Sequence, residues 1–597
     1  MLRKIISPII CEPIFFLMVL LLLLPRTLAF PFIKPSFWFE DWSQFPTLRF
    51  ISIGILFSYL LTTLVAKAHS FLLKILIYFV LYVLFFLNIF LAFNFNATIS
   101  PNTLLLALET TPAESYDFLS TYSLSLPSIF AYLVTFSTIV ITILLETKSE
   151  RIIRWVSNST KCNKYRHKLK CCLEIIFLLL LLCGLFSFRL YPQLLFIDTV
   201  EQMDRWNPKG LSSMDFITGL VYSCYDLNLT SKVLSRAVEV TIQATKEKPD
   251  LLNPEDSCSI ILVIGESFIK KHSSLYGYRL KTNPKLEREE DAKRLFVFKD
   301  VVSPSASTSA SIRNILSCNS IGDGEQWYDF PYFPTIFKNA GYDVYFWDNQ
   351  YHPTSNAGFD FSLNSYLHNS QISSITYNSW HGQISRLDGD IVNDYKKYRK
   401  EHPIGRKNFI IFHLQGMHFK QETRYPQSID FLKFISADID RKETWMTEEK
   451  KIAIAHYDNC TFYNDSVISS IISIFRNEPA VLVYFSDHGE HIYDVGDYYG
   501  RGLNIGTQNK AYACHLFEIP FVVWCSEKYI HRYPEMCRRL KDASKKPMMT
   551  DNICSFLMTL GGVKTRYYNE SRDILSEMYK CPPRIINNSI DYDKELK

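Results

Sequence analysis

The sequence lacks two features that would have assigned it to common classes. Lys and Arg number 64 against 60 Asp and Glu, so the net charge is only +4. A surface that binds nucleic acid needs a larger and more local basic excess, and we expect no nucleic-acid partner. The 14 cysteines include no CxxC pair, which argues against a cysteine-based zinc site. Disulfides are compatible with these cysteines outside the cytoplasm, but no pairing follows from sequence.

The composition conceals a division between the two parts of the chain. Mean hydropathy is +0.00, yet the first 190 residues are dominated by Leu, Phe, Ile and Val. A bilayer core requires about 20 apolar residues in a helix. Five stretches fit: 9–29, 50–66, 71–93, 127–145 and 172–190. Isolated charges, such as Lys74 and Glu174, fall near their ends. For the first stretch, a cleaved signal peptide ending near Ala29 is the alternative, which would leave four spans.

Basic residues are absent from 94–126, whereas 147–170 contains eight of them. Short loops rich in Lys and Arg stay in the cytoplasm. The basic loop is therefore predicted inside and the loop 94–126 outside, and Arg3 and Lys4 place the N-terminus inside. Five crossings then put everything after about residue 190 outside. The aromatic residues of 37–42 are expected at the membrane interface.

The sequence after residue 255 predicts an α/β fold. Residues 191–255 are polar to amphipathic and are expected to form bridging helices along the membrane. From 256 onward, short β-rich runs alternate with helical stretches, which indicates a mostly parallel sheet. The runs are Ser259–Ile264, Val344–Trp347, Phe409–Phe412, Val481–Phe485 and Phe521–Trp524.

Ligands bind beyond the carboxyl ends of the strands in such sheets. Carboxylates and imidazoles follow three of the runs: Glu266 after the first, His413 and His418 after the third, and Asp487-His488 after the fourth. This mixture of oxygen and nitrogen donors suits zinc, with manganese as the alternative ion. Asn349, which follows the second run, is a candidate for lining the site and equally a candidate turn residue.

Several blocks resemble the motifs of bacterial phosphoethanolamine transferases, which belong to the sulfatase-like branch of the alkaline phosphatase superfamily. They are VIGESFIKKHSSLYGYRLKTNP (263–284), SASTSASIRNILS (305–317), HLQGMHFKQETRYP (413–426) and FSDHGE (485–490). The five-span anchor is similar as well, and so is ALETTPAESYDFL (107–119) in the outer loop. The resemblance covers nearly the whole chain, and the blocks occur in the family's order.

The resemblance implies a metal centre that carries a threonine nucleophile. Glu266, Asp487 and His488 would bind one or two zinc ions, and Thr308 would be the nucleophile and also contact the metal. Coordination lowers the pKa of a hydroxyl and makes it a better nucleophile. Thr308 precedes a predicted helix, whose N-terminus favours an anion. The alternatives are that Thr308 is only a helix N-cap, or that a nearby serine of 303–309 is the nucleophile.

The resemblance also implies the substrates. The donor would be phosphatidylethanolamine in the bilayer, and the acceptor would be lipopolysaccharide or another envelope glycan. His418 would hold the transferred phosphoryl group, bind a second zinc or protonate the leaving group, and His515 would match a similar late histidine. Thr110 and Glu114 would hold the ethanolamine headgroup. For His418, His515, Thr110 and Glu114 a purely structural role is the alternative.

One departure concerns the acceptor. In the lipid A-modifying members, cysteines flank the nucleophile in a CGT-x-T-x-x-S-x-P-C pattern, whereas Pro304 and Asn314 stand at those places here. Only Thr308 and Ser311 of the pattern remain. The chain is therefore more similar to the branches that modify the lipopolysaccharide core or other glycans than to the lipid A branch.

Three other functions compete with this one. A phosphoglycerol transferase similar to lipoteichoic acid synthases would differ in the headgroup that it accepts. A sulfatase is disfavoured because residues 303–313 contain no cysteine. A non-catalytic membrane protein with a sulfatase fold would have lost metal ligands, and none is lost here.

The predicted organisation is a five-span anchor (1–190), bridging helices (191–255) and a sulfatase-like catalytic domain of α/β/α type (256–597). Together they predict a multi-pass enzyme of the bacterial inner membrane with its catalytic domain in the periplasm.

Overall fold

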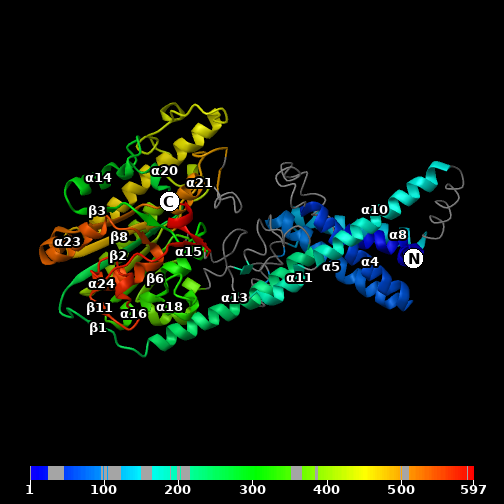
Figure 1. The fold of residues 1–597 in the computed structure, drawn as a ribbon, viewed down its shortest axis with the longest axis horizontal. Helices are drawn as coiled ribbons and strands as arrows, with labels where there is room; N and C mark the ends of the chain where they lie inside the picture. The colour runs from blue at the N-terminus through cyan, green and yellow to red at the C-terminus, as the bar shows by residue number, and fades with distance from the viewer. Residues whose placement is uncertain are drawn as a thin grey trace. The chain divides into compact units, whose positions relative to one another are not determined.

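The computed structural model describes residues 2–23, 46–95, 99, 104, 123–148, 164–188, 190–197, 202–203, 216–350, 366–382, 387–497, 499–500, 510–587 and 589–596 (Figure 1). The chain divides into two compact units. The described residues up to Ser231 belong to one unit, and those from Lys232 onward belong to the other. The division falls within helix α13 (Phe216–Ala244). This helix occupies part of the stretch for which bridging helices were predicted, and the predicted boundaries at 190 and 255 stay predictions.

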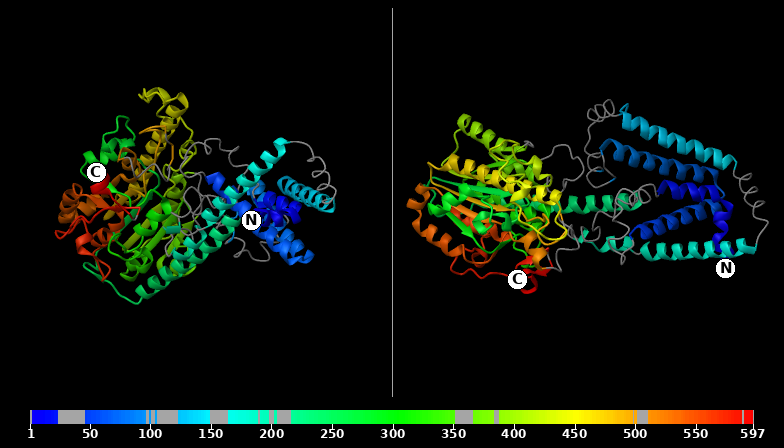
Figure 2. Two further views of the ribbon diagram at one scale, coloured as in Figure 1. Left: turned by 45° about the vertical axis from the view of Figure 1, so that its right-hand side comes forward. Right: turned by 90° about the horizontal axis from the view of Figure 1, so that it is seen from above.

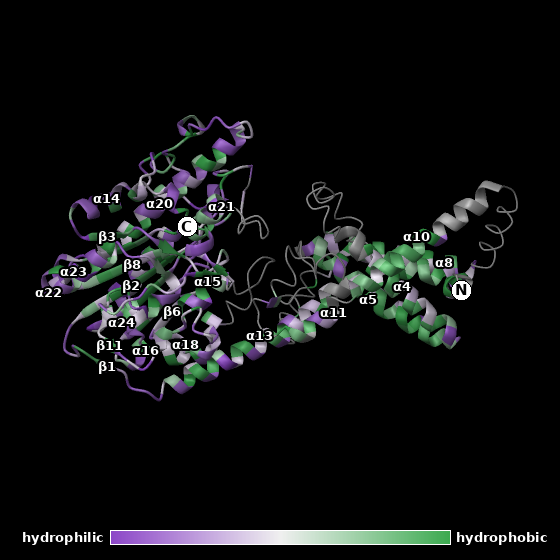
Figure 3. Cartoon of the chain, viewed as in Figure 1, coloured by the Kyte–Doolittle hydropathy of each residue, from purple (hydrophilic) through white to green (hydrophobic). Residues whose placement is uncertain are grey.

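The first unit is helical. Its main helices are α1 (Leu2–Cys11), α2 (Pro13–Leu23), α4 (Pro46–Ala68), α5 (Phe71–Phe95), α8 (Leu126–Thr147) and α10 (Lys164–Phe188), followed by α11 (Leu190–Gln193) and the 3₁₀ turn η2 (Leu194–Phe196). Figure 3 shows that apolar residues dominate α4, α5 and α8, whereas the second unit mixes apolar and polar residues. Apolar runs with no regular polar face are typical of membrane helices.

Three of the five predicted spans are confirmed as helices long and apolar enough to cross a membrane: Ile51–Ala68, Phe71–Asn94 and Leu126–Thr147. The first predicted span is a pair of helices, Ile5–Cys11 and Pro13–Leu23, bent by 95°. In the fifth, Glu174–Phe188 is an apolar stretch of α10. Within the described residues, the structure therefore supports three spans, or four if the bent pair counts as one, and a fifth is not confirmed.

Close helix contacts and one ion-pair cluster hold the helical unit together. A Cβ atom at Gly184 of α10 would lie 2.5 Å from the backbone oxygen of Ser52 in α4, so only glycine permits this close contact. Lys74, one of the charges expected near the ends of the apolar stretches, lies in this cluster. Its ammonium lies 2.7 Å from Glu12 Oε2 and 2.8 Å from Glu146 Oε2.

A seven-stranded sheet forms the centre of the second unit. Its strands are β2 (Cys258–Gly265), β3 (Leu295–Phe298), β5 (Asp343–Asp348), β6 (Ser379–Gly382), β7 (Lys407–His413), β8 (Ala480–Ser486) and β9 (Phe521–Cys525). They lie in the order β3-β9-β8-β2-β7-β5-β6. All five predicted strands are present. Only β9 runs antiparallel to its neighbours, so its carboxyl end lies at the opposite edge of the sheet.

Helices cover both faces of the sheet, as the views in Figure 2 show. One face carries α14 (Pro284–Asp291), α19 (Asp388–Glu401) and α20 (Glu448–Phe475), which share a core with alternate residues of the central strands. On the other face, α16 (Phe333–Asn339) stacks Phe337 on Phe409, and α24 (Ile553–Gly561) packs Phe556 against Phe521. The unit is therefore a three-layer α/β/α domain. The buried strands β2 and β8 both end at the carboxyl edge of the sheet.

Candidate metal and nucleophile site

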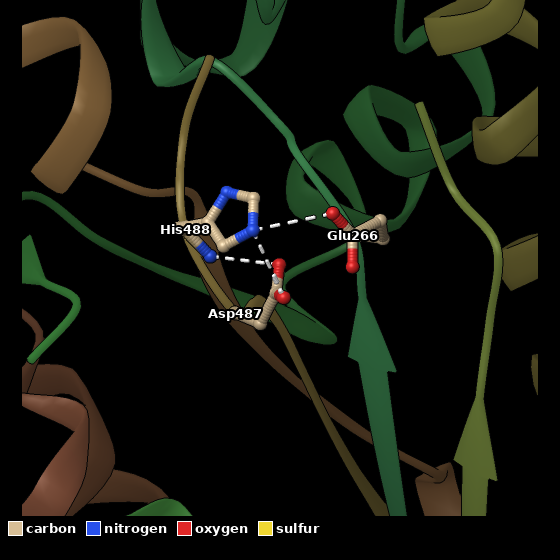
Figure 4. A group of neighbouring side chains, drawn as sticks. All are labelled: Glu266, Asp487 and His488. Atoms are coloured by element: carbon tan, nitrogen blue, oxygen red, sulfur yellow. Dashed lines mark hydrogen bonds and ion pairs between the residues drawn. The ribbon is translucent and has the colours of Figure 1, made fainter. Parts of the chain in front are cut away.

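Glu266, Asp487 and His488 meet at the carboxyl edge of the sheet (Figure 4). Strands β2 and β8 are parallel neighbours, with Gly265 opposite Ser486, so the residues that follow them leave the sheet at the same point. All three side chains are fully buried. Within the described residues, they form the one group of His, Cys, Asp and Glu side chains with metal-binding spacing, and their ligand atoms lie within 4.8 Å of one another.

The donor atoms of this group converge. His488 Nε2 lies 3.2 Å from Glu266 Oε1 and 3.3 Å from Asp487 Oδ2. His488 Nδ1 lies 2.7 Å from the backbone oxygen of Gly489 and donates its proton there, which directs the Nε2 lone pair toward the carboxylates. Two carboxylates and one imidazole nitrogen lone pair facing a common point fit a divalent cation, and zinc accepts all of these ligand types.

Gly489 is required for the arrangement. A Cβ atom at this position would lie 1.9 Å from the backbone oxygen of His515, and Gly489 N donates to Leu516 O at 2.7 Å. The loop that carries Asp487 and His488 is therefore held against helix α21 (Lys510–Phe517). This close approach explains the glycine in the SDHGE block.

Thr308 is the first residue of α15 (Thr308–Ile315) and faces the same group. Its Oγ1 lies 2.9 Å from Glu266 Oε2 and 3.1 Å from His488 Nε2. The neighbouring hydroxyls point elsewhere. Ser303 Oγ donates to Ser305 O, and Ser305 Oγ contacts Ser307 Oγ and Asn587 Oδ1. Of the hydroxyls of 303–309 for which contacts are described, that of Thr308 reaches the cluster, which favours it over its neighbours as the nucleophile.

His418 lies on the loop after β7, and this loop packs on Glu266. Gly416 has φ +48°, and a Cβ there would lie 2.7 Å from the backbone nitrogen and oxygen of Glu266. Met417 N donates to Glu266 O at 3.0 Å. The His418 side chain is partly exposed, and Arg424 Nη2 lies 3.4 Å from its Nδ1. The structure thus brings the His418 loop to the cluster, but His418 is not among the residues with metal-ligand spacing.

Buried Asp388 fixes this loop. Its carboxylate accepts hydrogen bonds from Gln415 N at 2.8 Å and Gly416 N at 2.9 Å. It also accepts one from Asn349 Nδ2 at 2.8 Å. Burial raises the pKa of Asp388, although these donors act against that shift. The predicted site residue Asn349 therefore uses its side-chain amide to hold Asp388.

Gln350, beside Asn349, was missed by the sequence analysis. Its Nε2 donates to Leu414 O at 2.7 Å and lies 3.3 Å from Glu266 Oε2. Side chains alternate in direction along an extended chain, so the residue after Asn349 is the one that turns toward the cluster. This alternation is the feature of the sequence that could have identified Gln350 as a site residue.

His515 contacts the site through its backbone. Its Nδ1 bonds Ala511 O at 2.8 Å within α21, and its ring lies 5.5 Å from that of His491. Burial lowers the pKa of both imidazoles, that of His491 to about 3. The remaining predicted residues, Thr110 and Glu114, lie outside the described residues, as do the aromatic residues 37–42.

A second buried histidine, His272, links the GES block to the loop beyond SDHGE. Its Nδ1 lies 2.7 Å from Asp458 Oδ1 of α20 and its Nε2 lies 3.0 Å from Asp494 Oδ1. Burial alone would lower the pKa of this imidazole, but the two carboxylates outweigh burial and raise it to about 10. His272 is therefore a buried imidazolium that joins three segments.

The domain has a three-layer α/β/α fold. Acidic and imidazole side chains lie at the carboxyl edge of its sheet, and a threonine at a helix N-terminus faces them. This arrangement is typical of enzymes that process phosphate or sulfate esters. The family model described as Sulfatase matches residues 259–563, about half of the chain. The chain belongs to the sulfatase family.

Within this family, the chain is similar to phosphoethanolamine transferases. It is 27% identical over 396 residues to phosphoethanolamine transferase EptC of Escherichia coli (strain K12), covering 63% of this chain and 64% of that protein. The crystal structure of the C-terminal periplasmic domain of E. coli EptC matches with a TM-score of 0.50 and 27% identity, covering 58% of this chain and 95% of that one.

The membrane protein EptA of Neisseria meningitidis, a lipooligosaccharide phosphoethanolamine transferase, matches with a TM-score of 0.52 and 17% identity. The match covers 95% of this chain and 98% of that one. This likeness is one of fold, and it extends over the helical unit as well as the second unit.

Proposed function

We propose that this protein transfers phosphoethanolamine from phosphatidylethanolamine to lipopolysaccharide or a related envelope glycan. The observation that supports this proposal most directly is the position of the Thr308 hydroxyl, 2.9 Å from Glu266 and 3.1 Å from His488. The similarity to EptC supports the choice of phosphoethanolamine.

The metal would be held by Glu266, Asp487, His488 and Thr308. We propose one or two zinc ions, with manganese as the alternative. When bound, the ion lowers the pKa of the Thr308 hydroxyl and stabilises charge on the phosphoryl oxygens. No metal is needed to explain how the chain positions Thr308, because hydrogen bonds and the start of α15 already do so.

The reaction proceeds in two displacements. Thr308 Oγ1 loses its proton to solvent and attacks the phosphorus of the donor lipid. The bond from phosphorus to the diacylglycerol oxygen breaks, and that oxygen takes up a proton, for which His418 is the proposed donor. Backbone N–H groups at the N-terminus of α15 favour the phosphorylated threonine. An acceptor hydroxyl then attacks the same phosphorus and gives its proton to His418, and the bond from phosphorus to Thr308 Oγ1 breaks; Thr308 Oγ1 regains a proton from solvent.

The chain is proposed to lie in the inner membrane as a multi-pass protein. Residues 1–190 form the anchor, 191–255 the bridging segment, and 256–597 the catalytic domain on the periplasmic side. A membrane anchor suits a lipid donor, because moving acyl chains into water costs about 0.8 kcal/mol per CH₂ group. Thr110, Glu114, Asn349 and His515 are proposed to contact the substrates. Pro304 and Asn314, in place of the flanking cysteines, support a glycan or core-sugar acceptor over lipid A.

The test uses the full-length protein with fluorescent phosphatidylethanolamine and zinc. Wild type should release diacylglycerol and carry a phosphoethanolamine adduct on the Thr308 peptide. Thr308→Ala should do neither, whereas Ser307→Ala, which removes the adjacent hydroxyl, should keep both. Release from phosphatidylglycerol but not from phosphatidylethanolamine would instead assign the chain to the phosphoglycerol transferases. An adduct that persists in Thr308→Ala would move the nucleophile to another hydroxyl.

A further inference from the structure

Two cysteines lie in contact within the described part of the catalytic unit. Cys318 Sγ and Cys554 Sγ are 3.3 Å apart, although 236 residues separate them in sequence. Other cysteines have different partners. Cys460 Sγ lies 3.4 Å from Gly416 O, and Cys514 Sγ lies 3.9 Å from the Tyr592 hydroxyl.

Hydrogen bonds already hold together the two chain segments that carry Cys318 and Cys554. After Cys318, Ile321 N donates to Asp551 Oδ2 at 2.8 Å, and Ser320 Oγ donates to Asn552 Oδ1 at 2.9 Å. Cys554 begins the first turn of α24 two residues after Asn552. Because these bonds hold the two segments together, the sulfur atoms can be joined without moving either chain far.

We propose that Cys318 and Cys554 form a disulfide in the mature protein, and that this bond ties the helix carrying Thr308 to α24. The proposal rests on the proposed periplasmic location, since disulfides persist in oxidising compartments. Cys318 is half-buried and Cys554 is buried, so Cys318 is the first to react.

The chemistry requires a disulfide-bearing thiol oxidase as oxidant. The Cys318 thiolate attacks one sulfur of the oxidase disulfide, which forms a mixed disulfide and releases one oxidase thiol. Cys554 loses its proton and attacks Cys318 Sγ, which releases the second oxidase thiol. Two protein thiols are oxidised to one disulfide, and the oxidase disulfide is reduced to a dithiol.

The bond would restrain the nucleophile. Cys318 lies three residues after the end of α15, and α24 packs on the sheet that carries the metal ligands through Phe556, whose ring is 5.9 Å from that of Phe521. A disulfide here joins the Thr308 helix to the sheet. The restraint would therefore enter from the C-terminal side of α15.

The test is peptide mapping of the full-length protein, made in a host that exports the domain to an oxidising compartment. Free thiols are blocked with N-ethylmaleimide during denaturation without reductant. We expect a linked peptide pair containing Cys318 and Cys554, and full labelling of Cys460 as the matched free thiol. Labelling of both Cys318 and Cys554 in unreduced protein would overturn the proposed bond.

The thermal stability of cysteine variants gives a second test of the bond between Cys318 and Cys554. Cys318→Ser, Cys554→Ser and the double variant should each lower Tm by the same amount, about 5 °C or more, because any of them removes the same bond. Unequal or additive losses would count against the disulfide. If the variants fail to fold, the peptide map of wild type decides alone. An oxidised but inactive protein would refute the proposed function and leave this inference intact, while an active protein with free thiols would do the reverse.

Discussion

The two units of the chain bury their apolar residues against different surroundings. Phe71 and Leu72 of α5 are 75% and 78% exposed, whereas all eight residues of β2 are buried. Apolar area left in water costs about 25 cal/mol per Å², so the helical unit depends on lipid for what the catalytic unit obtains from its own core. We therefore expect substitutions to affect one unit at a time, and each prediction below tests that separation.

The largest effect should come from Glu266→Gln. The change removes the charge of a proposed metal ligand and a partner of the Thr308 hydroxyl, 2.9 Å away. We expect activity to fall by about 10³-fold or more and bound zinc, measured by atomic emission, to fall with it. Glu287→Gln, which removes a carboxylate paired only with the exposed Lys281, is the control and should retain both. Normal activity in Glu266→Gln would exclude the proposed metal centre.

Next in size is the effect of His272→Gln on the stability of the catalytic unit. Breaking a buried ion pair costs about 3 kcal/mol, and His272 lies between Asp458 and Asp494. Its pKa is raised from 6.5 to about 10 in the folded protein, so folding takes up a proton. This contribution is fully present below about pH 6.5 and is lost as pH rises through about 10.

Urea unfolding of wild type and His272→Gln at pH 6.5 and pH 9.5 measures this contribution. The difference in free energy of unfolding should shrink markedly at the higher pH. Tyr278, which donates to Asp458 Oδ2 at 2.8 Å, is present in both proteins, so its titration largely cancels. His402→Gln replaces an exposed histidine and should show no such pH dependence. A constant difference would mean that His272 is neutral in the folded state.

A smaller effect, confined to the helical unit, is expected for Gly184→Leu. Its Cβ would meet the backbone of Ser52 at 2.5 Å, so α4 and α10 must separate, at a cost of about 2 kcal/mol. Thermal unfolding in detergent should show a lower transition for the helical unit and an unchanged one for the catalytic unit. Cys183→Leu changes the exposed neighbour and is the control. A shift of both transitions would show that the units are coupled.

The sequence predicted the catalytic fold well because continuous β-rich runs mark buried strands. It missed two strands. The four residues of β6, Ser379–Gly382, are only partly buried and form no apolar run, and β3 is an apolar run of only four residues. The sequence also could not give the direction of β9, since alternation and hydrophobicity are the same for parallel and antiparallel strands. In the helical unit, the predicted first span contains Glu12, which lies at the break between the two bent helices.

The sequence could predict those residues of the candidate site that directly follow a strand. Glu266, Asp487 and His488 follow two adjacent strands, so their position at one edge of the sheet could be expected. The contact between Cys318 and Cys554 depends on the packing of α24 beneath the sheet, which no local pattern encodes. The contact of Gln350 with the cluster depends on which of two neighbouring amide side chains faces it. Asn349 turns away because its side chain donates a hydrogen bond to Asp388.

Gln350→Met should therefore produce the smallest of these effects and the most local one. Methionine retains the size of the side chain but removes the amide that bonds Leu414 O at 2.7 Å and approaches Glu266 Oε2 at 3.3 Å. The loss of one hydrogen bond to a charged group is about 1–2 kcal/mol, which corresponds to about a tenfold fall in kcat/KM. Exposed Gln371 provides the control, Gln371→Met. Because Gln350 only orients Glu266, zinc content and Tm should stay close to wild type, whereas a loss of zinc equal to that in Glu266→Gln would mean that the amide is needed to build the centre itself.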